Sequence, residues 1–225
     1  MTGPAPLAQQ SLLDWDWVTR NAGRITDALV QHVELTLLAV AIGFLIAAPL
    51  ALAAVRWRRL YTPLLTFTGV LFSIPSLALF VLLLAFAGTG LGRTTSLIGL
   101  VIYTLLILFR NNVAGLDSVS ADVKEAAEAM GYTRARRLLR VEAPLALPVI
   151  MAGIRIATVT TIGLVTITAL IGQGGLGQLF LLGFRRTNNT PLVVGIVLSV
   201  LLAVAADLAL VVLQRRLTPW SKEQA

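Results

Sequence analysis

The segment DVKEAAEAMGYTRARRLLRVEAP, residues 122–144, is densely charged in a chain that is 57% hydrophobic. Long apolar runs lie on both sides of it. Charged side chains are costly inside the hydrocarbon of a bilayer, so this segment must lie outside it. The insert from Asp117 to Pro148 carries five bases and five acids, which are Lys124, Arg134, Arg136, Arg137, Arg140, Asp117, Asp122, Glu125, Glu128 and Glu142.

The composition predicts an all-α integral membrane protein. Only 13% of the 225 residues are charged and the mean hydropathy is +0.85, whereas a soluble domain is about a quarter charged. In lipid every backbone polar group must be bonded internally, which favours helices. Runs of roughly 20 apolar residues predict membrane-spanning helices, and the candidates are Leu35–Val55, Leu60–Gly92, Thr94–Phe109, Val149–Gly172 and Thr190–Leu213.

The second apolar run decides the number of spans. It has 33 residues, which would form a helix of about 50 Å where the hydrocarbon core is about 30 Å thick. Two spans would need about 40 residues and a turn. We therefore expect one tilted span, kinked at Pro75 and followed by an exit turn at Ala87–Thr94. The sequence predicts five spans, with six as the alternative.

The predicted organisation has three parts. Residues 1–31 form an extracytoplasmic segment with an amphipathic helix, because Trp15, Val18, Ala22, Ile25 and Leu29 recur at helical spacing. Residues 32–214 form the membrane domain and residues 215–225 a cytoplasmic tail. The membrane domain has spans at about 33–55, 62–87, 95–116, 149–172 and 190–213, and a loop at 117–148.

The basic residues predict the orientation, since cytoplasmic connections carry an excess of Lys and Arg. Five spans leave five bases on one side, namely Arg20, Arg24, Arg93, Arg185 and Arg186. The other side has eleven, namely Arg56, Arg58, Arg59, Lys124, Arg134, Arg136, Arg137, Arg140, Arg215, Arg216 and Lys222. The loop and the C-terminus are therefore expected in the cytoplasm and the N-terminus outside. This bias explains the net charge of +7.

The insert predicts two short helices joined by a glycine turn. Ser120 is a good helix cap and Gly131 a good helix stop. A second helix is expected from Thr133 to Val141, ended by Pro144 and Pro148. A small, mostly smooth face on the first helix is typical of a docking surface, and it consists of Val123, Ala126, Ala127 and Met130.

This insert has three candidate roles. A DNA-binding helix-turn-helix is disfavoured, because its second helix has about nine residues and both ends are tethered to the membrane. An inert loop would need bases for orientation but no balancing acids and no capped helices. A site for a cytoplasmic partner accounts for all of these features.

The insert resembles the EAA loop in the permease subunits of type I ABC importers. Glu125-Ala126-Ala127 is followed after three residues by Gly131, and after nine more by Val141-Glu142-Ala143-Pro144. The family pattern is EAA, three residues, G, nine residues, I-x-L-P. Valine and alanine here replace Ile and Leu, and the second change removes an apolar contact but keeps the turn. Over roughly residues 32–220, including ALIGQGGLGQLF and RRLTPW, the chain is similar to permeases for glycine betaine, carnitine, choline and related osmoprotectants.

The resemblance implies a type I importer fold and a set of partner chains. It implies a path for a compatible solute such as glycine betaine, choline, carnitine or proline. The alternatives are a permease for methionine or another amino acid and, from another class, a channel or scaffold without ATP coupling. A second permease, identical or homologous, two cytoplasmic ATPase subunits that bind ATP and Mg, and an extracytoplasmic binding protein are implied at a bacterial inner membrane. The implied coupling residues are Glu125, Ala126, Ala127, Glu128, Gly131 and Pro144.

No catalytic, metal or nucleotide site is expected in the chain itself. A phosphate-binding loop requires GxxxxGK followed by Ser or Thr, and the two lysines, Lys124 and Lys222, follow valine and serine. The chain has no Cys and a single His, His32, which is expected at the membrane interface. We therefore expect a transporter subunit rather than an enzyme, without a cofactor, a metal or nucleic acid.

The segment IGQGGLGQLFLLGFRR, residues 171–186, predicts a tight turn and a short helix near Leu176–Gly183, because its glycines disfavour one long helix. It fits two roles equally well, a purely structural turn or an outer gate that contacts the binding protein. The residues assigned to the second role are Gly172, Gly174, Gly175, Gly177, Arg185 and Arg186.

Three charged side chains lie in or beside the apolar runs. Intramembrane charges need a partner or water, so Asp207 is expected to pair with Arg110 or Arg155 near the cytoplasmic side. A contact between Asp207 and a solute cation is the alternative. Aromatic side chains that could hold a quaternary ammonium are scattered along the sequence, and they are Trp57, Phe67, Phe72, Phe80, Phe86, Tyr103 and Phe109.

Overall fold

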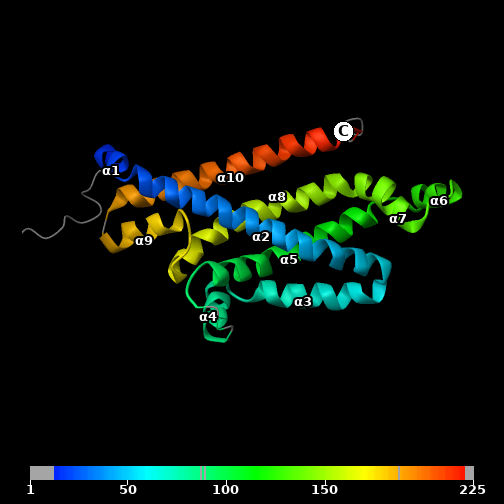
Figure 1. The fold of residues 1–225 in the computed structure, drawn as a ribbon, viewed down its shortest axis with the longest axis horizontal. Helices are drawn as coiled ribbons and strands as arrows, with labels where there is room; N and C mark the ends of the chain where they lie inside the picture. Colours follow the sequence, from blue (N-terminus) through cyan, green and yellow to red (C-terminus); the bar gives the residue numbers. More distant parts are fainter. Residues whose placement is uncertain (1–12, 87, 89, 187, 221–225) are drawn as a thin grey trace, which may run out of the picture. The chain divides into compact units, whose positions relative to one another are not determined.

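The computed structural model describes residues 13–86, 88, 90–186 and 188–220, and all regular elements within these ranges are helical. This confirms the predicted all-α fold. The predictions for residues 1–12, for Ala87 and Thr89 in the exit turn, and for residues 221–225 lie outside the described residues. Figure 1 shows the helices α1 (Trp15–Arg20), α2 (Ala22–Arg56), α3 (Tyr61–Ser73), α4 (Ser76–Phe86), α5 (Arg93–Asp117), α6 (Ala121–Ala129), α7 (Arg134–Arg137), α8 (Ala143–Ile167), α9 (Gly177–Arg186) and α10 (Asn189–Leu217).

Four helical stretches in the described part of the chain are long and apolar enough to cross a membrane. They are α2, α5, the continuous helix Arg134–Ile171 that contains α7 and α8, and α10. The second predicted span is divided, because α3 ends at Ser73 and α4 begins at Ser76, and the pair is bent by 96°. Pro75 lacks a backbone N–H and breaks the helix where the sequence predicted a kink. The described residues therefore contain four crossing helices, or the predicted five if the bent pair is one broken span.

The predicted N-terminal amphipathic helix is wrong in its extent. Asp14 caps α1 by accepting a hydrogen bond from the Trp17 N–H at 3.1 Å. α1 ends at Arg20, and α2 begins at Ala22 and continues to Arg56. The apolar spacing predicted for residues 22–29 belongs to α2, because Ala28 packs there against Leu176. Residues 22–31 are therefore the first turns of the first long helix.

The predicted break before the fourth span is also wrong. A π-helical turn, Leu138–Glu142, joins α7 to α8, and the Ala143 N–H donates to the Leu138 carbonyl. Widened turns of this kind let a helix continue past an irregular position. Pro144 is the second residue of α8 and Pro148 lies further inside it, so neither proline ends the helix.

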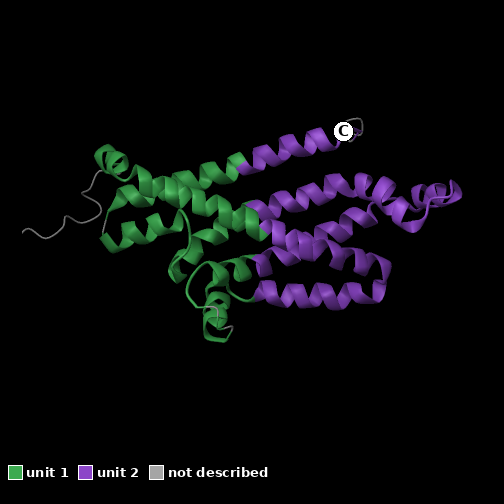
Figure 2. Cartoon of the chain, in the orientation of Figure 1, with its two compact units in different colours: residues 1–39, 74–100, 159–205 green, residues 40–73, 101–158, 206–225 purple. Residues whose placement is uncertain are grey.

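The chain forms two compact units, which Figure 2 distinguishes by colour. Unit 1 comprises residues 1–39, 74–100 and 159–205, and unit 2 comprises residues 40–73, 101–158 and 206–225. Described residues of unit 1 include a core cluster of Ala28, Leu176 and Leu179. The larger cluster of unit 2 contains Ala47, Ala51, Ala54, Leu108, Phe109, Val113 and Ala157.

Small residues let helices of unit 2 approach one another closely. A methyl group added at Gly43 in α2 would overlap the hydroxyl of Thr104 in α5. A methyl group added at Gly153 in α8 would overlap the side chain of Asn111 in α5. Close backbone approach through small residues is typical of helix packing in membranes. These two glycines therefore set the distance of α2 and α8 from α5.

Gly43→Ala should destabilise the protein by about 1–3 kcal/mol, because the added methyl overpacks a tight contact. Gly69→Ala in α3 is the matched control, since an added methyl there has no heavy atom within 4 Å. The control should be neutral or stabilising by about 0.5–1 kcal/mol. Thermal unfolding of the purified protein in detergent measures both changes. Equal effects of the two substitutions would contradict this account of the packing.

Candidate functional site

The first helix of the charged loop, α6, begins at the residue that the sequence predicted. Ser120 is its N-cap, and the Ser120 hydroxyl accepts a hydrogen bond from the Val123 N–H at 3.5 Å. Asp122 lies in the first turn, where a negative charge is favourable. The local sequence thus accounts for the start of α6.

The end of α6 depends on Gly131. The Gly131 N–H donates to the Glu128 carbonyl at 2.9 Å, and the Tyr132 N–H donates to the Ala127 carbonyl at 3.1 Å. These two bonds form a Schellman motif, which needs a residue with positive φ. Gly131 has φ = 76°, and a side chain added there would meet no heavy atom within 4 Å. Gly131 is therefore required for its backbone conformation rather than for space.

The predicted docking face of α6 is smaller than the sequence indicated. Glu125 and Ala126 are exposed, and Met130 is 68% exposed. Ala127, however, is only 1% exposed, so it packs inside the chain. The structure therefore separates two residues that the sequence placed on one surface. Ala126 faces outward, and Ala127 anchors α6 from within.

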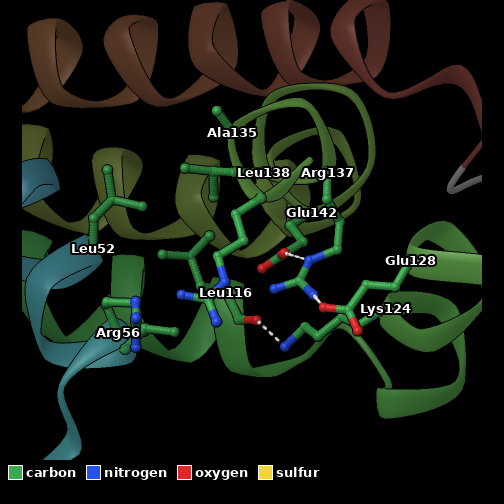
Figure 3. A pocket seen from close by; sticks show the side chains of 11 residues that line it. Leu52, Arg56, Leu116, Lys124, Glu128, Ala135, Arg137, Leu138 and Glu142 are labelled. Carbon is green, nitrogen blue, oxygen red and sulfur yellow. Dashed lines mark hydrogen bonds and ion pairs between the residues drawn. The ribbon is translucent and has the colours of Figure 1, made fainter. Parts of the chain in front are cut away.

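Arg137 connects α6 to the beginning of α8. Thr133 caps α7 by accepting a hydrogen bond from the Arg136 N–H at 3.4 Å. Arg137 then donates to the buried Glu142 at 2.6 Å and to Glu128 on α6 (Figure 3). Arg137 therefore joins α6 to the residues that lead into α8.

A cavity of about 520 Å³ lies beside this ion-pair network in unit 2. Figure 3 shows Arg137 between Glu142 and Glu128, and Lys124 near Leu116. The Lys124 ammonium donates to the Leu116 carbonyl at 3.3 Å. Pro144 lies next to this region and lines a separate small cavity with Arg140. The large cavity is lined by Leu52, Val55, Arg56, Leu116, Lys124, Glu128, Arg134, Ala135, Arg137, Leu138 and Glu142.

The glycine-rich segment forms the predicted tight turn and short helix. Gly172 ends a 3₁₀ turn with φ = 85°, and Gly174 and Gly175 also have positive φ. A methyl group added at Gly177, at the start of α9, would overlap the backbone of Thr166. Arg185 and Arg186 are exposed at the end of α9, and Arg185 lines a cavity of about 330 Å³.

Two side chains of α2, Gln31 and His32, bind this turn by hydrogen bonds. The sequence does not indicate these contacts. The side-chain oxygen of Gln31, Oε1, accepts hydrogen bonds from the Gly175 N–H at 3.0 Å and from the Gln178 side-chain amide at 2.9 Å. The buried His32 ring accepts from the Leu176 N–H at 3.3 Å. The other ring nitrogen therefore carries the proton and donates to the Ile162 carbonyl at 2.9 Å. His32 is fully buried among the helices of unit 1.

Among the three charges of the apolar runs, the structure brings two together. Arg155 in α8 donates to both carboxylate oxygens of Asp207 in α10, at 2.8 and 2.9 Å. This is a bidentate pair, the strongest geometry for an arginine and a carboxylate. Arg110 is exposed and lies on α5, where it lines a different cavity.

The described residues contain no group of three or more His, Cys, Asp or Glu side chains that could hold a metal ion. The described chain thus combines a capped charged loop, a hydrogen-bonded glycine turn and an ion pair between α8 and α10 with long apolar helices. These features define a multi-pass membrane protein with a structured polar loop.

The chain belongs to the family of binding-protein-dependent transport system inner membrane components, whose profile matches residues 39–219. It is a permease subunit of an ABC transporter rather than an enzyme, and it is a multi-pass protein of the inner membrane. The family implies ATPase and substrate-binding partners.

Similar proteins include osmoprotectant permeases. The osmoprotectant import permease protein OsmW of Salmonella typhimurium is 40% identical over 202 residues, which are 88% of this chain and 94% of that protein. The glycine betaine/carnitine/choline transport system permease protein OpuCD of Bacillus subtilis is 35% identical over 209 residues, 92% of this chain and 90% of that protein. The fold is similar to that of the MetNI methionine ABC transporter, with a TM-score of 0.77, 23% identity, and coverage of 86% of this chain and 96% of that one.

Asp207→Ala should lower the level of folded protein, because it leaves the Arg155 charge in an apolar helix without its carboxylate. The double variant Asp207→Ala with Arg155→Ala should recover part of that loss, while Asp207→Ala with Arg110→Ala should not. Size-exclusion profiles of membrane extracts measure the folded fraction. Normal folding of Asp207→Ala with a raised half-saturating solute concentration would instead assign Asp207 to the solute.

Proposed function

We propose that this permease subunit imports a small quaternary-ammonium osmoprotectant, such as glycine betaine, choline or carnitine. The observation that carries the proposal is the 40% and 35% identity to osmoprotectant permeases over about nine-tenths of the chain. Three solved transporter structures, two of a methionine and one of an amino acid transporter, share 20–24% identity and support only the fold.

Reconstitution tests the solute directly. The permease, its ATPase and its binding protein are placed in proteoliposomes, and uptake of radiolabelled glycine betaine, choline, carnitine and methionine is measured with and without ATP. Uptake of the three quaternary amines that requires ATP supports the proposal. Methionine uptake alone, or solute flux without ATP, would contradict it and favour the amino acid or the channel alternative.

The proposed complex contains a second permease, two ATPase subunits and an extracytoplasmic binding protein. Relatives with paired names support two different permeases, because Bacillus subtilis has both OpuCB and OpuCD for glycine betaine, carnitine and choline. ATP and Mg would bind to the ATPase subunits. Gly172, Gly174, Gly175, Gly177, Arg185 and Arg186 are proposed to form the outer gate or the contact for the binding protein.

The charged loop is proposed to couple the permease to the ATPase. Three features support this role: the outward face of α6 with Glu125, Ala126 and Met130, the strict backbone demand at Gly131, and the link from Glu128 through Arg137 to the buried Glu142. A force on α6 would reach α8 through that link and through the continuous helix Arg134–Ile171. Pro144, at the start of α8, lies on the same route.

Gly131→Val should uncouple ATP hydrolysis from transport, because a β-branched residue is a backbone outlier at φ = 76°. Gly131→Asn is the matched control, since asparagine is tolerated at this helix-end position. The valine variant is expected to lose about tenfold or more of its uptake per ATP hydrolysed, given a strain of roughly 1–2 kcal/mol in the motif. Uptake and ATPase rates in proteoliposomes give this ratio. A normal ratio of uptake to ATP hydrolysis in the valine variant would contradict the coupling role of the charged loop.

The proposed orientation places the loop and the C-terminus in the cytoplasm and the N-terminus outside. The chain has no native cysteine, so single cysteines report the side of the membrane. Arg58→Cys and Arg136→Cys should react with a membrane-impermeant thiol reagent only from the cytoplasmic side. Thr19→Cys should react only from outside. Reaction of Arg58→Cys and Thr19→Cys from the same side of the membrane would contradict the proposed orientation.

A further inference from the structure

One cavity of unit 2 combines a charged side chain, an amide and an aromatic ring. Its volume of about 380 Å³ lies within the range of small-molecule pockets, about 300–1,000 Å³. Arg110 and Asn111 are its polar residues, and the other walls are apolar. The lining comes from α3, from one face of α5 and from α8, and consists of Phe72, Leu106, Ile107, Arg110, Asn111, Ala114 and Ile156.

Arg110 needs an anion or water in this cavity. It lies in α5, seven residues before Asp117, which is about 10 Å along the helix. The carboxylate of Asp117 is bound by Arg58 at 2.9 Å, and the carboxylate of Asp207 is bound by Arg155. A charge within an apolar helix faces water or a partner. The geometry therefore leaves Arg110 available for a carboxylate from outside the chain.

An aromatic pair lies on the same face of α5 as Arg110. Phe72 and Tyr103 meet edge to face, with ring centroids 5.6 Å apart and planes at 70°. Phe72 is 37% exposed and lines the cavity, whereas Tyr103 is only 5% exposed and fixes the ring of Phe72. Tyr103 precedes Arg110 by two helical turns, and side chains on a helix lean toward its N-terminus. Arg110 and Phe72 line the same cavity.

Asn111 is held beside Arg110 by its neighbours. Its amide nitrogen donates to the Ile107 carbonyl at 2.8 Å. Gly153 in α8 makes room for the Asn111 side chain, because any Cβ at that position would overlap it. These two contacts hold the Asn111 side chain in place at the cavity wall.

We propose that this cavity binds the solute on its way through the permease. Arg110 binds the carboxylate of a betaine, and the face of the Phe72 ring binds the quaternary ammonium, which aromatic rings attract. A zwitterion with both groups uses both contacts, whereas choline, which has a hydroxyl in place of the carboxylate, uses only the ring. This assignment rests on the proposed function, and it adds a selectivity site within the permease itself.

Equilibrium binding to the permease–ATPase complex in nanodiscs, without the binding protein, tests the site with radiolabelled glycine betaine and choline as probes. Arg110→Gln should weaken glycine betaine about tenfold or more, because a charged hydrogen bond is lost, and should change choline less than about twofold. Phe72→Leu should weaken both solutes by about three- to tenfold. Arg59→Gln, and Phe67→Leu on the exposed side of α3, are the matched controls and should bind both solutes as the wild type does.

The outcomes separate the site from the function. Equal effects of Arg110→Gln on both solutes, or no binding by a wild type that transports them, would overturn the site. A third outcome would also overturn the site: Arg110→Gln loses bound phosphatidylglycerol but binds glycine betaine as the wild type does. Arg110 would then be a lipid contact. A wild-type complex that transports methionine and no quaternary amine would overturn the proposed function instead.

Discussion

The cost of placing charges and unpaired backbone groups in hydrocarbon is the constraint on which the rest of this structure depends. It explains why the crossing elements are helices and why the charged loop lies between two of them. It also explains the bidentate pair of Arg155 with Asp207, since each would be costly alone in an apolar helix. The same reasoning underlies the proposal that Arg110 binds a carboxylate from outside the chain.

The charged loop is built to keep a fixed shape against the membrane helices. Its first helix is capped by Ser120 and ended by Gly131 in a left-handed conformation. Glu142 is buried and is neutralised by Arg137, which also holds Glu128. Because the π turn passes directly into α8, a displacement of α6 has a covalent and an electrostatic route into a membrane-spanning helix. This rigidity is what a coupling element requires.

The features predicted correctly from the sequence depend on local signals or on the small number of charges in the apolar runs. Ser120, Gly131 and Pro75 act within a few residues of themselves, and charges are so rare in the apolar runs that Asp207 had only two candidate partners. The choice of Arg155 over Arg110 depends on helix rotation, which sequence spacing does not define. The contacts of Gln31 and His32 join residues 144 positions apart through backbone N–H groups, and the π turn has no sequence signature. The local sequence around Pro75 likewise predicts a break in the helix but not the size of the bend.

The central claim is that α6 is the surface that meets the ATPase. Site-specific photo-crosslinking tests it most directly in the assembled complex. A photoreactive amino acid at Met130, which is exposed on the loop, should crosslink to the ATPase subunit, whereas one at Phe184, exposed on α9, should not. A complex that remains assembled and active but yields no ATPase crosslink from Met130, or yields one from Phe184, would contradict the account.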